Sequence, residues 1–252
     1  MRFLRAIHTG YGLIIFTLLF ILLLPLLLIP ICFPSAFRMT GWINRIWARL
    51  LFTFVFLPFH VEYRHRPDKT RQYIFCPNHF SYLDIPTLGL NCHNTIFVGK
   101  SEMENIPVFG YMYRKLHITV NRASLKSKVN TIKRSLQAID EGKSLVVFPE
   151  GGIVTEKDPI MARFKDGAFR MAIEKQIPIV PVTIPYNWII LPPDEFLLKW
   201  HPIRVIFHEP VTTTGLTLDD IDDLKTNVFQ IINEELQKHL TARHENRPRT
   251  AR

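Results

Sequence analysis

Short hydrophobic runs alternate with longer polar segments along most of this chain. Runs of four to six apolar residues bounded by turn-forming residues are typical of buried strands. Such runs lie at residues 73–76, 95–98, 117–120, 145–148, 179–184 and 203–207. Segments of helical length separate several of them. This alternation predicts an α/β fold, with a mixed, largely parallel sheet flanked by helices.

Two helices are expected from the spacing of their apolar residues. One apolar face is formed by residues at steps of three and four, in a helix that should end at Gly142: Leu125, Val129, Ile132, Leu136 and Ile139. A last helix should begin near Thr217-x-x-Asp220, which has the spacing of a capping box. Its apolar positions are Leu224, Val228, Ile231, Leu236 and Leu240.

The first part of the chain is far more hydrophobic than the rest. No charged residue occurs from Thr9 to Phe37, and residues 11–33 are long and apolar enough to cross a bilayer. A second apolar stretch, 50–59, is too short to span one. Between them lie residue types common at membrane interfaces: Arg38, Trp42, Arg45, Trp47 and Arg49. We therefore expect residues 1–59 to form a membrane anchor, 60–242 a globular domain and 243–252 a basic tail.

The pattern leaves the arrangement of this anchor open. It could be a transmembrane helix followed by an interfacial one, or a helical pair kinked by Pro25 and Pro30 that dips into one leaflet. A cleaved signal peptide is less favoured, because its apolar region is usually only about 7–15 residues. Arginines flank both ends, so they do not set the orientation. We expect a cytoplasmic membrane with the globular domain on the cytoplasmic side.

Composition narrows the choice of partners. A net charge of +9 favours an acidic one: an anionic membrane surface, a phosphate-bearing substrate or nucleic acid. No acidic residue occurs between Asn105 and Ile139, a stretch with seven cations: Arg114, Lys115, Arg122, Lys126, Lys128, Lys133 and Arg134. This stretch could contact anionic lipid or an acidic carrier, or be an ordinary solvated face. Nucleic acid ranks low, because the aromatic residues do not alternate with the cations.

The three cysteines form neither a disulfide framework nor a zinc pattern. Cys92-His93 has no second pair to complete a metal site, so no metal is expected. Three unpaired cysteines suit a reducing compartment.

A histidine and an aspartate with four residues between them follow the first expected strand. His79 lies in the corner after that strand, and Ser81 with Asp84 has capping-box spacing, so a helix should begin at Ser81. Asp84 could then hold one imidazole nitrogen of His79 and leave the other free to accept a proton. Taken alone, the pair could equally be a hydrogen-bonded loop histidine and a helix cap.

Other chemically active residues follow the next expected strands. Lys100 follows the second, Arg122 the third, and Glu150 with Gly151 the fourth. Ligands of open α/β sheets bind beyond the carboxyl ends of the strands. A base, two cations and a glycine-lined carboxylate at that edge indicate a site for an anionic substrate with a hydroxyl group. Individually, each could be a surface charge, a helix cap or a tight turn.

With these residues in place, the chain resembles the glycerolipid acyltransferases, and most of all the 1-acylglycerol-3-phosphate acyltransferases. The resemblance covers about residues 60–210. The family's four ordered motifs have matches in His79-x4-Asp84, in residues 100–107 with 110–122, in 148–151 and in 179–182. The third motif departs from the pattern, since Gly152-Ile153 stands where the family usually has Thr-Arg. Arg163 or Lys165 could replace that arginine.

The resemblance implies a membrane-bound enzyme without a cofactor. His79 would deprotonate the hydroxyl of a lysolipid, and the oxygen would attack the thioester of an acyl carrier protein or coenzyme A, with Asp84 orienting His79. Arg122, Glu150 and Gly151 would bind the acceptor, joined by Lys100 and Lys165. The expected product is phosphatidic acid. Two alternatives stay open: another acceptor such as a lyso-aminolipid, and a non-catalytic module that binds membrane surfaces.

Overall fold

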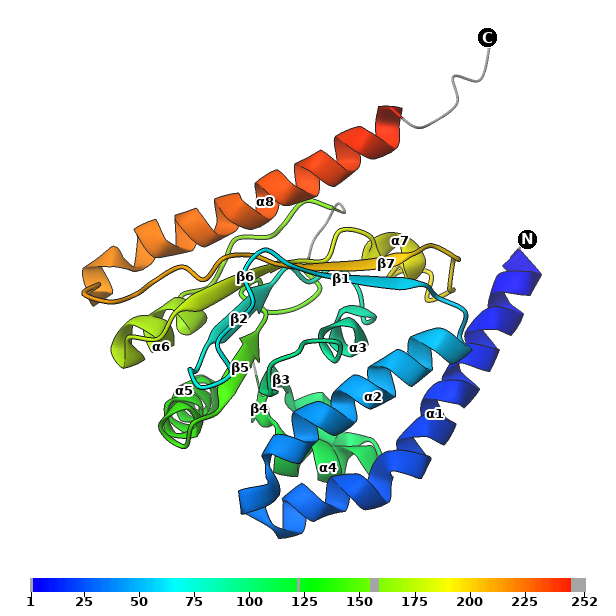
Figure 1. The fold of residues 1–252 in the computed structure, drawn as a ribbon, viewed down its shortest axis with the longest axis horizontal. Coiled ribbons are helices and arrows are strands. Elements are labelled where there is room, and N and C mark those ends of the chain that lie inside the picture. Colours follow the sequence, from blue (N-terminus) through cyan, green and yellow to red (C-terminus); the bar gives the residue numbers. More distant parts are fainter. Residues whose placement is uncertain (1, 122, 155–158, 246–252) are drawn as a thin grey trace.

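A seven-stranded sheet forms the centre of the protein in the computed structural model, which describes residues 2–121, 123–154 and 159–245 (Figure 1). The strands are β1 (Phe59–Tyr63), β2 (Ile74–Pro77), β3 (Thr95–Lys100), β4 (Ile118–Val120), β5 (Ser144–Val147), β6 (Ile179–Thr183) and β7 (Ile203–Phe207). Their order across the sheet is β1-β7-β6-β2-β5-β3-β4. Neighbours run parallel except β6 and β7. The mixed, largely parallel sheet predicted from the strand–helix alternation is confirmed.

Helices cover both faces of this sheet. They are α1 (Arg2–Cys32), α2 (Arg38–Phe54), α3 (Asp84–Leu88), α4 (Phe109–Leu116), α5 (Leu125–Asp140), α6 (Gly167–Lys175), α7 (Asn187–Ile190) and α8 (Ile221–Glu245). The described residues also form three short 3-10 turns, Pro34–Ala36, Ser101–Asn105 and Leu218–Asp220, which precede α2, α4 and α8. In Figure 1, α5, α6 and α8 lie on one side of the sheet, and α1 to α4 on the other.

The central strands are buried on both faces, which explains their unbroken apolar runs. In β2, Ile74 and Cys76 pack against α5, α6 and α8, whereas Phe75 belongs to a second cluster that contains Leu88 of α3. The side chains of successive residues point to opposite faces, so one short run contributes to two cores. Because β2 is the middle strand of the sheet, the residues that follow it are held from both sides.

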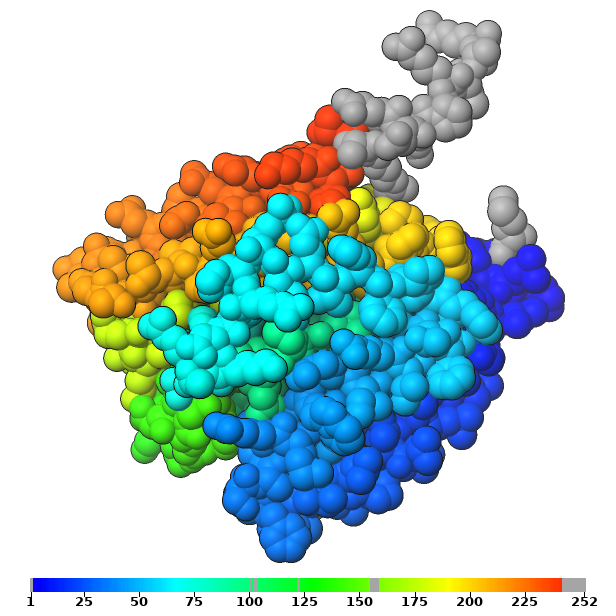
Figure 2. Space-filling model, viewed as in Figure 1, coloured from blue at the N-terminus to red at the C-terminus, as the bar shows by residue number. Residues whose placement is uncertain are grey.

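The expected anchor forms a helical hairpin packed on the globular domain. Leu23 and Leu27 of α1 form a buried cluster with Ile43 of α2 and Met112 of α4. The described residues contain one helix long and apolar enough to cross a membrane, and only 22% of the residues in its most apolar 18-residue stretch are buried. In the space-filling view, α1 and α2 form a continuous surface along one side of the molecule (Figure 2).

Five expectations from the sequence are wrong in detail. The strand β1 was not expected, because Phe59 had been taken as the end of the anchor; β1 pairs with β7 instead. The first helix after His79 begins at Asp84 rather than Ser81, since the Ser81 hydroxyl donates to the carbonyl of Leu191, 2.7 Å away. The helix α8 continues to Glu245, past the expected boundary at residue 243. On α8 the fully buried isoleucine is Ile232, not Ile231.

The fifth correction concerns α5. Leu125 and Val129 are 76% and 62% exposed, although their spacing had predicted a core position. The residues of α5 that face the sheet are small: Thr131, Ser135 and Ala138 are buried, together with Ile139. Small side chains let the helix approach β4 closely, and the Thr131 hydroxyl donates to its own helix and to Thr119. The buried face of α5 is centred on these small residues, and Leu125 and Val129 lie outside this face.

We predict that deleting residues 2–54 yields aggregated protein rather than a soluble domain. The deletion would expose the apolar residues of the globular part that α1 and α2 cover, among them Leu83, Leu90 and Leu116, and large exposed apolar surfaces cause association. Size-exclusion chromatography without detergent is the measurement, with deletion of residues 246–252 as the control. A monodisperse domain from the larger deletion would contradict this packing.

Candidate active site

His79 is held in the corner where the chain leaves β2. The preceding residue, Asn78, forms two hydrogen bonds with Ile184 just beyond β6: its side chain donates to the carbonyl of Ile184 (3.1 Å) and accepts from its N–H (2.7 Å). Pro77 pairs with Val182 one step earlier in the sheet. This pairing fixes the exits of two neighbouring strands relative to each other, and His79 projects from the fixed point.

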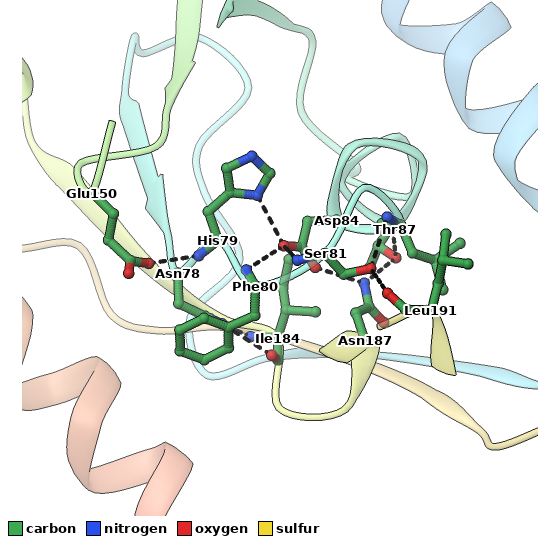
Figure 3. A network of polar contacts seen from close by, with 11 residues as sticks. Asn78, His79, Phe80, Ser81, Asp84, Thr87, Glu150, Ile184, Asn187 and Leu191 are labelled. Carbon is green, nitrogen blue, oxygen red and sulfur yellow. Dashed lines mark hydrogen bonds and ion pairs between the residues drawn. The ribbon is translucent and has the colours of Figure 1, made fainter. Parts of the chain in front are cut away.

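The carboxylate of Asp84 organises the turn around His79. Its Oδ2 accepts hydrogen bonds from Nδ1 of His79 (3.0 Å) and from the N–H groups of Phe80 and Ser81 (both 2.9 Å). Its Oδ1 accepts from Nδ2 of Asn187 (2.9 Å). The side chain is fully buried, and Figure 3 shows these contacts converging on it. The predicted pairing of Asp84 with the ring of His79 is present in the structure.

These contacts set the proton positions on the imidazole. A carboxylate only accepts, so the proton of the neutral ring lies on Nδ1 and a lone pair lies on Nε2. Among the described residues no protein group is hydrogen-bonded to Nε2. The phenyl ring of Phe148 stacks on the imidazole at 3.8 Å between ring centres. The ring is therefore held by Asp84 and Phe148 and has one nitrogen available to a substrate proton.

Glu150 holds the backbone of His79 by a hydrogen bond. Its side chain is fully buried; Oε1 accepts from the N–H of His79 (2.7 Å) and Oε2 from the N–H of Ala162 (2.8 Å). Sequence reasoning had assigned Glu150 to acceptor binding. The contacts bring Glu150 to His79 as expected, but through the backbone, and they favour a positioning role.

Lys165 lies against the glycine of the third motif. Gly151 has a φ of +79°, and a Cβ at this position would collide with the Lys165 side chain. The backbone N–H of Lys165 also donates to the carbonyl of Pro149 (2.9 Å). The residue suggested as a substitute for the missing arginine is thus next to the motif, with its side chain exposed. A larger residue at 151 would displace it.

The other two expected cations are less fully described. Lys100 is the last residue of β3 and pairs with Val120 of β4, so both strands end at the edge where β2 and β5 end. The side chain of Lys100 and the whole of Arg122 lie outside the described residues. Their acceptor-binding roles stay predictions.

Ser81 and Cys76, the two residues close to His79 in sequence that could act as nucleophiles, have structural roles. The Ser81 hydroxyl donates to Leu191 and accepts from the N–H of Leu83 (3.1 Å). Cys76 lies in β2 and is fully buried, and burial raises the pKa of its thiol far above the ordinary value. Neither offers a free, ionised nucleophile to a substrate.

Sequence reasoning missed Asn187 and the role of Asn78. Asn187 follows β6 by four residues, and the rule that functional residues follow parallel strands would have pointed to it. The rule had been applied only to charged residues and glycines. Asn78 directly precedes the motif, but its pairing with Ile184 depends on strand neighbours that sequence spacing does not give.

An apolar cavity of about 430 Å³ begins beside this corner. The motif segment contributes Tyr82 and Leu83 to its wall. The opposite wall comes from α1, with Gly12, Phe16 and Phe20, and further residues come from α2 and α4. A cavity of this volume with a mostly apolar lining is typical of a binding site for a small ligand with apolar groups.

Comparison with known proteins gives a consistent result. A family model described as acyltransferase matches residues 59–185, half of the chain. The chain is similar to a chloroplastic 1-acyl-sn-glycerol-3-phosphate acyltransferase of Brassica napus, with 32% identity over 58% of this chain and 42% of the relative. A chloroplastic relative of Arabidopsis thaliana has 28% identity over 71% of this chain and 50% of its own length. The chain thus spans about half the length of these relatives.

The fold has a close match among solved structures. The crystal structure of a 1-acyl-sn-glycerophosphate acyltransferase from Thermotoga maritima aligns with a TM-score of 0.80, over 94% of this chain and 97% of the other. Sequence identity is 22%, so the match shows a shared fold. It includes most of the described hairpin, since so little of this chain lies outside the alignment.

The Glu150→Gln variant should be less stable by about 1–3 kcal/mol, the cost of an unsatisfied buried hydrogen-bonding group. A glutamine has one acceptor oxygen, so its NH2 group would face the N–H of His79 or of Ala162. Thermal unfolding in detergent measures the change. Glu141→Gln, at an exposed glutamate that contacts Lys143, is the matched control and should shift stability by less than about 0.5 kcal/mol. Equal melting temperatures for the two variants would show that the buried hydrogen bonds of Glu150 do not stabilise the fold.

Proposed function

The chain belongs to the acyltransferase family, and we propose that it transfers a fatty acyl group from a thioester donor to the hydroxyl group of a lysolipid. The observation that carries the proposal is the oriented histidine: Nδ1 of His79 is bound to a buried carboxylate, and Nε2 is left for a substrate. The apolar cavity beside it supports a lipid substrate.

The proposed reaction is a direct transfer. Nε2 of His79 takes the proton of the acceptor hydroxyl as its oxygen attacks the thioester carbonyl. The carbon–sulfur bond then breaks, and the imidazolium returns its proton to the departing thiolate. Asp84 keeps the ring oriented and stabilises its cationic form in between. The products are an ester and a free thiol, and no acyl-enzyme or bound cofactor takes part.

An acceptor with a phosphate group is supported by the cation next to the third motif. The side chain of Lys165 packs against Gly151, the residue that follows Glu150. We propose that Lys165 takes the place of the arginine that the motif lacks, with Arg122 and Lys100 as further phosphate-binding cations. The preferred acceptor is 1-acylglycerol-3-phosphate, which would give phosphatidic acid. Ile153 in place of the arginine favours a lyso-aminolipid as the alternative acceptor.

Polar contacts of α1 support an anchor that lies in one leaflet. The guanidinium of Arg5 contacts the carboxylate of Glu195 at 2.7 and 2.8 Å and donates to the carbonyl of Leu197. Thr9 accepts from the N–H of Leu198. Together with the packing of Leu23 and Leu27 on α2 and α4, these contacts hold α1 along the domain from end to end.

Because α1 is attached to the domain along its length, α1 could span a bilayer only if the attached part of the domain entered the bilayer as well. We therefore propose that α1 rests with its free face in lipid. That face carries large apolar side chains: Phe3, Leu4, Ile7, Ile14, Leu18 and Leu22 are all more than half exposed. The cytoplasmic membrane, with the catalytic domain on the cytoplasmic side, remains our expected location.

Exposed cations on α4 and α5 suit an anionic surface. Arg114 and Lys115 are exposed on α4, which contributes to the cavity wall, and Lys126 and Lys128 are exposed on α5, on the other side of the sheet (Figure 1). We propose that these cations contact anionic lipid headgroups or an acyl carrier protein. Coenzyme A, which is also anionic, is the alternative donor.

Replacing His79 by alanine should lower turnover by about 10²–10⁴-fold, because a positioned general base contributes that much. Asp84→Asn should also be severely impaired, since the amide disturbs the protonation state of the ring. Formation of phosphatidic acid from a thioester donor and 1-acylglycerol-3-phosphate, followed by mass spectrometry, measures both. His65→Ala, at an exposed histidine, is the control. Near-parent turnover in folded His79→Ala would rule out the mechanism.

Lys165→Ala should raise the KM of a phosphorylated acceptor roughly tenfold, equivalent to about 1.4 kcal/mol of binding, and leave the donor KM nearly unchanged. Arg122→Ala should behave alike, and Arg122→Lys should not restore it, because lysine lacks the bidentate fork. Arg170→Ala, at an exposed arginine of α6, is the control. Equal rates with monoacylglycerol and its phosphate in the parent would reject the phosphate proposal and favour the lyso-aminolipid.

A further inference from the structure

We infer that Asn187 is a positioning residue of the reaction, which holds the carboxylate of Asp84 in the orientation that binds His79. This role rests on the proposed function of His79 and Asp84. Asn187 is the first residue of α7 and is fully buried. It is 103 residues from Asp84 in the chain and lies outside the four sequence motifs. Figure 3 shows its side chain pointing at the motif turn.

The hydrogen bonds around Asn187 require two donors at this position. Nδ2 lies 2.9 Å from Oδ1 of Asp84 and 2.9 Å from Oγ1 of Thr87. The Thr87 hydroxyl gives its own proton to the carbonyl of Leu83 (2.8 Å), so its oxygen is left to accept. The carboxylate has no proton to give. An NH2 group satisfies both neighbours, and the amide oxygen in its place would satisfy neither.

The two carboxylate oxygens of Asp84 accept hydrogen bonds from different parts of the chain, and Asn187 is the donor to Oδ1. Oδ2 receives the three hydrogen bonds from the motif turn, including that of His79. Among the described residues, Oδ1 receives one hydrogen bond, from Asn187. The two sets of donors fix the plane of the carboxylate. Without Asn187, Oδ1 would be a buried charged oxygen without a partner, which favours rotation or protonation of the group.

The turn after β2 and the segment that follows β6 are also connected by contacts other than those of Asn187. Asn78 independently joins the exit of β2 to Ile184 by two hydrogen bonds. The backbone around the turn should therefore persist when only the Asn187 amide is changed. This separates an effect on the Asp84 carboxylate from a general loss of the fold.

The decisive variant is Asn187→Asp, which keeps the shape of the side chain and replaces the two donors by acceptors. We expect kcat to fall about 10–100-fold near pH 8, with both KM values within about twofold of the parent. At lower pH the new carboxyl group is protonated and can donate one hydrogen bond. The pH profile of kcat/KM should then gain a falling alkaline limb that the parent lacks.

A second comparison separates positioning from stability. Asn187→Leu and Asn91→Leu remove equally buried amides, and Asn91 lies at the opposite end of the sheet, before β3. Both should lower the melting temperature, but only Asn187→Leu should lower kcat. Thr87→Ser keeps the hydroxyl that accepts from Asn187, so it should retain near-parent kcat. If Asn187→Asp does not accumulate as folded protein, the comparison of Asn187→Leu with Asn91→Leu decides whether Asn187 has a positioning role.

The double variant of Asp84→Ala with Asn187→Leu tests whether Asn187 acts through Asp84. Because the partner is already absent, the second change should cost less than about threefold in single-turnover rate. A further loss as large as in the parent background would overturn the inference. So would a parent-like kcat and pH profile in Asn187→Asp while Asp84→Ala is inactive. Parent-level activity in Asp84→Ala would instead refute the proposed mechanism, and the role of Asn187 with it.

Discussion

The buried carboxylate of Asp84 is the constraint on which the site depends. A buried anion is costly unless hydrogen bonds replace the water that it loses. Asp84 receives them from the His79 ring, from two N–H groups of its own turn and from Asn187 on a distant segment. These groups meet only when β2 and β6 end side by side, as the pairing of Pro77 with Val182 provides. The parallel sheet therefore sets the geometry of the proposed base.

The same corner connects the proposed chemistry to the hairpin of α1 and α2. Ser81 donates to Leu191, at the start of the loop whose later residues, Glu195 and Leu198, bind the first turns of α1. The cavity lies between the motif segment and α1, so the hairpin is part of the proposed substrate site as well as the proposed anchor. A loop held at both ends in this way fixes the position of α1 relative to the segment that carries His79.

Much of this arrangement could be predicted from the sequence, because it depends on local pattern. The apolar runs located six of the strands, and the spacing of His79 and Asp84 predicted their contact. What could not be predicted depends on neighbours in space. The partner of Asn187, the brace from Glu150 to the backbone of His79 and the pairing of β1 with β7 follow from strand order. Likewise, Leu125 and Val129 have helical core spacing, but the small residues beside them set which face is buried.

The protonation state of His79 tests the central claim most directly. Nitrogen-15 NMR of histidine-labelled protein in nanodiscs, with His79→Ala to assign the signal, distinguishes a protonated Nδ1 from a protonated Nε2. The account predicts a neutral ring with its proton on Nδ1 at the pH of activity, and a change of this pattern in Asp84→Asn, whose amide can donate to Nδ1. A neutral His79 that carries its proton on Nε2 in the parent protein would contradict its role as the base.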